Sequence, residues 1–361
     1  MGVEIKLTDK DFPVSAEFIE FLHHDQTGQP LDAKWHDQLS EALVPSDVEK
    51  KREVAQSVAE SVLRHPAGQK AIYRSYELFT ALLTGLPESL RSIHDRYRFI
   101  CVVGCPRHGG SYLTKQLFLA LGIDPDKVPN ALAHDGFPDA RPFHLKEQSN
   151  SITIMMQNAA EYLAMVEVLF SNSRLHDHFV VVPKKATKAA YHGAFFSTVL
   201  GPATEFVITL RHPVAAAIST YEKSTGLPAD GRFIVRGNIE EWARRDVVST
   251  GEDSEEIFKR DYFDVYLRYW EQYHYHLALS GLFASRNCKI VVYGRERMMQ
   301  LAQTYFTRFG KKSKVEDFKV FDNRKRHLEW DGKAEQAIQR VAGVWKSVGQ
   351  VFPVDEVMER W

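Results

Sequence analysis

The sequence predicts an α/β protein, with a three-layer fold around a parallel sheet and a helical extension in front of it. From Arg98 onward, short runs of apolar and β-branched residues alternate with stretches of helical character, which is typical of parallel βα units. The runs are apolar throughout, as in strands that helices cover on both faces. With 361 residues, 44% hydrophobic and 26% charged, the chain has the composition of an ordinary globular protein. Its length allows two domains, or one large α/β domain with additions.

The first 95 residues are predicted to form a helical extension. Ser46-Asp47-Val48-Glu49 fits a capping box at the start of one helix, which ends before Pro66. A second helix is indicated by apolar residues at helical spacing, namely Ile72, Tyr76, Phe79 and Leu83. We expect these helices to pack on the outside of a core. A role in dimerisation, which would give a homodimer, or in gating an acceptor is the alternative.

The α/β core is predicted over residues 96–330, and a C-terminal helical segment over 331–361 packs on it. The expected strands of the core are Phe99–Val103, Phe179–Val182, Glu205–Leu210 and Lys289–Tyr293. An aromatic stretch around Tyr262 to His276 is predicted to be a packed helix.

Charge and cysteine content exclude several classes of protein. The 46 basic and 47 acidic residues give a net charge of -1, whereas a nucleic-acid-binding domain usually has a basic excess. The three cysteines, Cys101, Cys105 and Cys288, are too few and too far apart for a disulfide framework or a Cys-x-x-Cys metal site. The first residues lack the apolar region of a signal peptide, and no run approaches the roughly 18 apolar residues of a spanning helix. We therefore expect a cytoplasmic protein without a transmembrane segment and without a nucleic-acid partner.

A glycine-rich turn follows the first core strand directly. Its sequence is Gly104-Cys105-Pro106-Arg107-His108-Gly109-Gly110-Ser111, and a helix through Leu113 and Leu117 comes next. A strand, a glycine-rich turn and a helix N-terminus in this order can bind a phosphate through backbone N–H groups and the helix dipole. The usual phosphate loop has Lys where Gly110 stands, and here the cation comes earlier, at Arg107. The alternative is a glycine-containing turn without a function.

Cations also follow the other core strands. Lys184 and Lys185 follow the second, Arg211 the third and Arg295 the fourth. A nucleoside-triphosphate enzyme would instead hold Mg²⁺ with an acidic residue at the end of a buried strand. This pattern favours an anionic nucleotide that side chains neutralise directly, with no metal required.

A second motif begins after the third strand. Arg211 lies at the strand end, Pro213 suits the first turn of a helix, and Ser219 follows Arg211 by eight residues. Both can face the crevice at the carboxyl end of the sheet, where α/β proteins bind ligands. Together, Pro106-Arg107-His108-Gly109-Gly110-Ser111 and Arg211-x-Pro-x-x-x-x-x-Ser219 resemble the two motifs of sulfotransferases that use 3′-phosphoadenosine 5′-phosphosulfate (PAPS). The resemblance is closest to the Golgi-type and bacterial branch, which has a P-loop-NTPase-like fold.

This resemblance implies a co-substrate, PAPS, and residues that bind it. The loop from Pro106 to Tyr112, with Arg107, His108, Gly109, Gly110 and Ser111, would bind the 5′-phosphosulfate. Arg211 and Ser219 would bind the 3′-phosphate, with Lys223 as a further cation, and Tyr293 would contact the adenosine. Arg324 and Lys325 are also candidates for the 3′-phosphate side, with a solvated basic turn as the alternative.

The implied reaction transfers a sulfuryl group to an acceptor hydroxyl or amine and releases adenosine 3′,5′-bisphosphate. Arg107 would stabilise the leaving group, assisted by Lys184 or Lys185. The alternative for the two lysines is a solvated pair at the end of the strand. Members of this family place a Glu or His about 20 to 30 residues beyond the loop, so the resemblance implies His134 as the base, and an imidazole suits neutral pH. Asp135 is its rival, with His108, His144 and Glu147 as further candidates. The acceptor is open: carbohydrate, lipid, small alcohol and peptide all fit. Two other functions are a metal-dependent kinase of similar architecture and a non-catalytic module that binds an adenosine bisphosphate.

Overall fold

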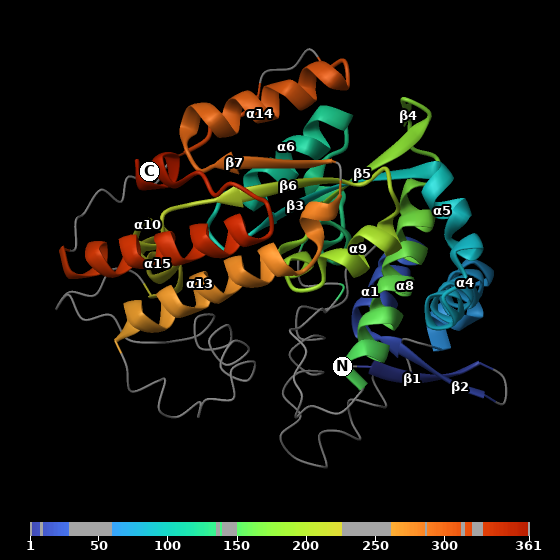
Figure 1. The fold of residues 1–361 in the computed structure, drawn as a ribbon. Helices are drawn as coiled ribbons and strands as arrows, with labels where there is room; N and C mark the ends of the chain where they lie inside the picture. The colour runs from blue at the N-terminus through green and yellow to red at the C-terminus, as the bar shows by residue number, and fades with distance from the viewer. Residues whose placement is uncertain are drawn as a thin grey trace. The chain divides into compact units, whose positions relative to one another are not determined.

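The computed structural model describes residues 2–7, 10–28, 60–134, 138, 150–225, 261–285, 287–311, 315–319 and 328–359 (Figure 1). Several predicted features lie outside them. These are the capping box at 46–49, Asp135, His144, Glu147, Arg324 and Lys325. The chain divides into two compact units. The first unit comprises residues 1–97, 128–139 and 148–182, and the second unit comprises 98–127, 140–147 and 183–361.

Five strands form a mixed sheet in the order β4-β5-β3-β6-β7, which confirms the α/β class. All four predicted strands are present, as β3 (Tyr97–Gly104), β5 (Phe179–Lys185), β6 (Glu205–Leu210) and β7 (Cys288–Val292). The prediction of a purely parallel sheet is wrong, because the short strand β4 (Leu175–His176) pairs antiparallel with β5. Asp177 and His178 both have positive φ, as a two-residue hairpin turn requires.

The second unit carries the parallel strands β3, β6 and β7. Gly104 of β3 is in register with Thr209 of β6, and Leu210 of β6 with Val292 of β7. Each strand leads into a helix: β3 into α6 (Gly110–Leu121), β6 into α10 (Pro213–Thr225) and β7 into α14 (Arg295–Arg308). The chain order changes direction between β3 and β6, since β5 lies on one side of β3 and β6 on the other. In open α/β sheets, ligands bind at the carboxyl ends of the two strands that flank such a point.

Two long helices complete the described core of the second unit. They are α13 (Tyr262–Leu279) and α15 (Leu328–Ser347), which pack together. The predicted aromatic helix is confirmed, since the side chains of Tyr262, Tyr266 and Trp270 are buried. A short helix, α16 (Val354–Met358), follows α15 and contacts it.

The first unit begins with strands rather than with a helix. β1 (Gly2–Leu7) pairs antiparallel with β2 (Lys10–Ser15), so the helical prediction is wrong for residues 2–7 and 10–15. The physical reason is visible in β1, where Val3, Ile5 and Leu7 alternate with charged residues, the period-two pattern of a strand. α1 (Ala16–Thr27) follows β2.

The predicted second helix is present as α4 (Pro66–Thr84), which ends at Gly85 with φ of 65°. It packs against α8 (Asn150–Phe170). The first unit also includes α8 and the short helix α7 (Asn130–Ala133). The sequence analysis had assigned both helices to the α/β core. The side chains of α8 in this packing are buried over most of the helix, so α4 covers an apolar face of α8.

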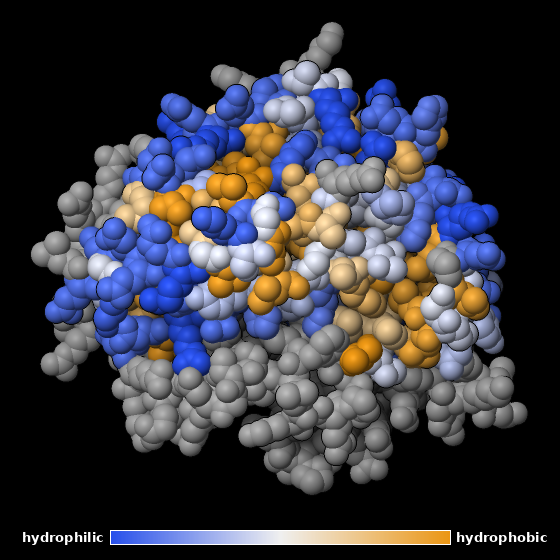
Figure 2. All heavy atoms as spheres, viewed as in Figure 1, coloured by the Kyte–Doolittle hydropathy of each residue, from blue (hydrophilic) through white to orange (hydrophobic). Residues whose placement is uncertain are grey.

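The surface of the described residues mixes hydrophilic and hydrophobic side chains on the face shown in Figure 2. Some large apolar side chains are exposed, including Leu83 on α4 and Ile154 on α8. Within the described ranges, no helix is long and apolar enough to cross a membrane.

A buried carboxylate ties the first residue of β6 to two other elements. Glu205 accepts hydrogen bonds from Lys289 Nζ (3.0 Å), from Arg308 Nη1 (2.7 Å) and from the Tyr305 hydroxyl. Burial alone would raise the pKa of Glu205, but these three hydrogen bonds together hold it below its ordinary value. The ionised carboxylate therefore stabilises the fold where β6 begins.

Replacing this carboxylate tests its contribution. We expect Glu205→Gln to lower the free energy of unfolding by about 2 kcal/mol at pH 7, since charged hydrogen bonds are lost. A lowered pKa stabilises the fold above the pKa of free glutamate and loses that effect as the pH falls further. The difference between the two proteins should thus shrink below about pH 4.5. Urea unfolding at pH 7 and pH 4 measures it. The exposed Glu335→Gln is the control, and equal stabilities at pH 7 would contradict the account.

Candidate functional site

The glycine-rich turn has a tightly constrained backbone where it leaves β3. A Cβ atom on Gly104 would lie 1.9 Å from Thr209 Oγ1, so only glycine allows β3 and β6 to approach at this end. Gly109, the N-cap residue of α6, has φ of 87°, and Arg107 has φ of 69°. Left-handed backbone is uncommon for a residue with a side chain. Arg107 therefore needs other contacts to hold it in this conformation.

These contacts come from the second motif. Arg211 Nη1 donates to the backbone carbonyl of Arg107 at 3.0 Å, and Arg107 Nε donates to Ser219 Oγ at 3.0 Å. Arg211 and Ser219 are 2% and 1% exposed. Arg211 follows β6 directly, and the eight-residue spacing places Ser219 on the second turn of α10, facing the loop. The two sequence motifs thus form one site.

The site concentrates positive charge in a buried place. The Arg211 guanidinium lies 3.8 Å from the centre of the Tyr293 ring, a cation–π contact. Burial lowers the pKa of Arg211 and the neighbouring Arg107 lowers it further, while Tyr293, Tyr266 and Glu222 act in the opposite direction. A guanidinium stays charged even so. A bound anion would relieve the repulsion between the two arginines.

Tyr293 packs against Arg211 in the structure, and its contact with the adenosine stays a prediction. Its ring is 4% exposed, covers Arg211 and lies 5.1 Å from the ring of Phe318. In this arrangement Tyr293 supports the guanidinium from within the protein.

His108 points into the core rather than to the surface of the loop. Its side chain is 0% exposed, and Nδ1 lies 3.1 Å from the carbonyl oxygen of Thr209. Because a carbonyl only accepts, Nδ1 carries the proton. Burial holds the pKa of His108 well below its ordinary value, and His274 and Arg211 add to the effect. The low pKa makes this buried imidazole a weak base, and its contact with the co-substrate stays a prediction.

The two lysines of β5 lie on opposite faces of the strand, as adjacent residues must. Lys184 is 2% exposed. Burial raises the pKa of the Cys101 thiol to about 12, and the nearby charge of Lys184 opposes this effect. Lys185 Cε lies 3.5 Å from the position of a Cβ on Gly110. Of the two predicted assistants, Lys185 is therefore the one beside the start of α6.

Ser111 is exposed on the first turn of α6, where backbone N–H groups have no partner within the helix. Tyr112 already has a partner: its hydroxyl donates to the Glu316 carbonyl at 2.8 Å, and its ring lies 4.5 Å from that of Phe318. Burial raises the pKa of Tyr112 to about 12, and Asp317 and Glu316 contribute. This tyrosine anchors a neighbouring segment, residues 315–319, rather than presenting its hydroxyl to a ligand.

The sequence analysis did not predict that residues 315–319 pack on α6. It also missed Gln116, which binds this segment through two hydrogen bonds. Gln116 is 1% exposed. Its Oε1 accepts from Glu316 N at 3.1 Å and its Nε2 donates to Glu316 Oε2 at 3.3 Å. Phe318 then lies against Gly109. No pattern in the sequence pairs residues 200 apart, so no signal could have found this contact.

Of the remaining predicted residues, His134 and Lys223 lie within the described ranges. His134 is exposed just after α7 in the first unit. Lys223 belongs to α10. Asp135, Arg324 and Lys325 lie outside the described residues. Within the described ranges, no group of three or more His, Cys, Asp or Glu side chains could hold a metal ion.

The burial of His108 gives a pH dependence that can be measured. A histidine with a lowered pKa stabilises the fold fully above about pH 6.5, and this contribution is lost as the pH falls, because only the unfolded chain takes up the proton. We expect stability to fall more steeply below pH 6.5 in the native protein than in His108→Asn, by up to about 1.4 kcal/mol per pH unit. Urea unfolding between pH 8 and pH 5 gives both curves. The exposed His134→Asn should follow the native curve, and parallel curves for His108→Asn would refute the assignment.

No family model matches the chain, and no curated protein matches it. The proposed function therefore depends on the geometry of the site and on the two motifs.

Proposed function

We propose that this protein is a PAPS-dependent sulfotransferase, which transfers a sulfuryl group to an acceptor hydroxyl or amine and releases adenosine 3′,5′-bisphosphate. The observation that carries the proposal is the hydrogen-bonded unit formed by Arg107, Ser219 and Arg211. This unit connects the glycine-rich loop, which is suited to bind one phosphate group, with the residues after β6, which are suited to bind another. A nucleotide with phosphates at both the 3′ and 5′ positions needs two such sites, one for each end.

The place of this unit in the sheet supports the proposal. Gly104 ends β3 and Arg211 follows β6, and the strand order changes direction between these two strands. The loop then delivers Gly110 and Ser111 at the N-terminus of α6, where N–H groups and the helix dipole favour an anion. Arg107 and Lys185 add two positive charges to this part of the site.

The residues at the strand ends favour sulfuryl transfer over metal-assisted phosphoryl transfer. A kinase of this architecture uses a lysine in the loop and an acidic residue at a strand end to hold Mg²⁺. Here Gly110 stands at the lysine position, and β5 and β6 are followed or ended by Lys185 and Arg211. Side-chain cations can neutralise the leaving phosphate directly.

Each residue then has a role in the proposed reaction. The acceptor oxygen attacks sulfur, the bond from sulfur to the bridging oxygen breaks, and the electron pair stays on the leaving phosphate while a base takes the acceptor proton. The planar guanidinium of Arg107 suits the leaving oxygens, and Lys185 assists. Arg211 and Ser219 hold the 3′-phosphate end. His134 remains our candidate for the base.

The 3′-phosphate assignment has a selective test. We expect Arg211→Ala to reduce the preference for adenosine 3′,5′-bisphosphate over adenosine 5′-phosphate by about 10- to 100-fold, because a charged hydrogen bond contributes in this range. Ser219→Ala should reduce the same preference by a smaller factor. The ratio of the two affinities, measured by calorimetry, separates this role from a general disturbance of the loop.

The matched control is Arg340→Ala, which removes an arginine that pairs with Glu271 instead. It should leave both affinities unchanged. If Arg211→Ala lowered both affinities equally, Arg211 would only support the loop, and the 3′-phosphate site would have to lie elsewhere.

A further inference from the structure

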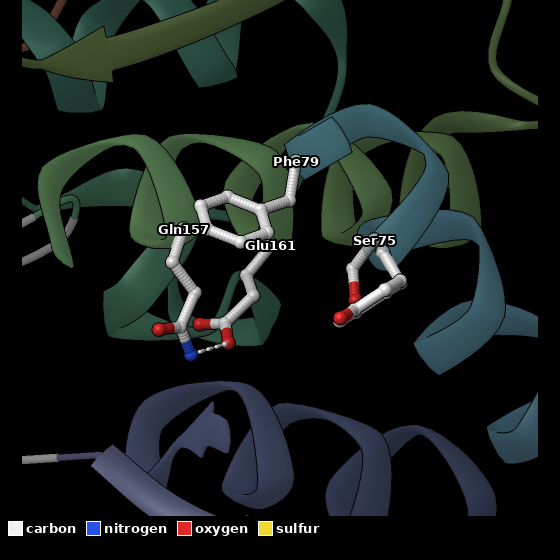
Figure 3. A pocket seen from close by; sticks show the side chains of 5 residues that line it. Ser75, Phe79, Gln157 and Glu161 are labelled. Carbon is white, nitrogen blue, oxygen red and sulfur yellow. Dashed lines mark hydrogen bonds between the residues drawn. The ribbon is translucent and has the colours of Figure 1, made fainter. Parts of the chain in front are cut away.

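A small cavity in the first unit lies between α4 and α8, and none of the residues that line it has a role in the proposed reaction. Ser75, Tyr76 and Phe79 reach it from α4, and Gln157 and Glu161 from α8 (Figure 3). The cavity is partly open to solvent, and its volume of about 10 Å³ is room for one water-sized group. It therefore suits a single head group of a ligand and excludes a large one.

Glu161 supplies the chemistry of the cavity. Its side chain is 2% exposed, and its carboxylate accepts from Ser15 N at 3.0 Å, from the Ser15 hydroxyl and from Gln157 Nε2 at 2.9 Å. A carboxylate offers about four acceptor positions. The three donors therefore leave the Glu161 carboxylate able to accept a further hydrogen bond. Burying its negative charge without a cation costs free energy.

The other groups around the cavity also favour a cation with N–H donors. The hydroxyl proton of Ser75 is used in a bond to the Ile72 carbonyl at 2.8 Å, so Ser75 Oγ can only accept from a ligand. The rings of Tyr76 and Phe79 lie 6.2 Å apart, edge to face, and an aromatic face attracts ammonium groups. A carboxylate, a hydroxyl lone pair and an aromatic ring are together complementary to an ammonium group.

We propose that this cavity binds a primary ammonium group, with Glu161 as its counter-ion, Ser75 Oγ as a second acceptor and Phe79 packed against it. The ammonium has three N–H donors, which match two oxygen acceptors and leave one for solvent at the open side. A quaternary ammonium has no such donors and exceeds the size of the cavity. The site is independent of the proposed sulfuryl transfer.

Binding should be coupled to a proton. Burial raises the pKa of Glu161 to about 7, opposed by the hydrogen bonds from Ser15 and Gln157, and the nearby Glu17 of α1 raises it further. On the α4 side, Tyr76 lines the cavity, while Arg74 of the same helix pairs with Glu167 and Glu77. Helix α7 carries no charged side chain. An ammonium ion binds the carboxylate form, so its binding releases the proton that Glu161 holds below pH 7.

The test follows the Glu161 carboxyl carbon by ¹³C NMR in full-length protein with labelled glutamate, at fixed ionic strength. Methylammonium chloride at tenfold its dissociation constant should lower the pKa of Glu161 by about one pH unit. In tetramethylammonium chloride at the same concentration, the pKa of Glu161 should equal its value in sodium chloride. Glu161→Gln identifies the signal.

Two further variants keep the test decisive if Glu161→Gln does not fold. Ser75→Ala retains the bonds between Ser15 and Glu161 but removes the second acceptor, so it should need several-fold more methylammonium for the same change. Thr80→Ala, on the same helix but outside the cavity, should behave as the native protein. A pKa of Glu161 that does not respond to methylammonium, or responds equally to tetramethylammonium, would overturn the proposal and leave a cavity for water only.

Discussion

The hydrogen bond from Arg211 to the backbone of Arg107 is the contact on which the rest of the proposed site depends. A guanidinium that is 2% exposed needs acceptors and a polarisable neighbour to offset its lost hydration. The Arg107 carbonyl and the Tyr293 ring supply them. In return, Arg211 holds Arg107 in left-handed backbone geometry, which aims its side chain at Ser219. Loop, strand end and helix are thereby fixed together before any ligand arrives.

Residues in the core and on neighbouring helices also hold the loop and the end of β6 in place. His108 ties the loop to the Thr209 carbonyl from within the core, and Trp270 of α13 donates to the Arg211 carbonyl at 3.2 Å. Gln116 and Tyr112 hold residues 315–319 against α6. Preorganised charge of this kind lowers the reorganisation needed during a reaction, which is usually the largest part of catalysis in group transfer. A net charge of -1 for the whole chain gives no hint of such local concentration.

Much of the fold could be predicted from the sequence because its signals are local. The apolar runs identify β3, β5, β6 and β7, and the eight-residue spacing from Arg211 places Ser219 on the correct side of α10. The missed features depend on tertiary partners. Period-two alternation puts Lys184 and Lys185 on opposite faces of β5, but only the packed structure shows that Lys185 is beside Gly110. Likewise, nothing local shows that His108 turns inward or that Glu316 lies on Gln116.

The most direct test of the central claim is a transfer assay with PAPS that carries ³⁵S in the sulfuryl group, run against a panel of alcohols, phenols, amines and a cell extract, with an excess of metal chelator present. The account predicts equal amounts of labelled acceptor and adenosine 3′,5′-bisphosphate in the presence of chelator. It also predicts a loss of rate of about 100-fold or more in Arg107→Ala, the usual effect of removing one stabilising donor. Tight binding of PAPS that is recovered intact with every acceptor, or activity that disappears on chelation, would contradict it.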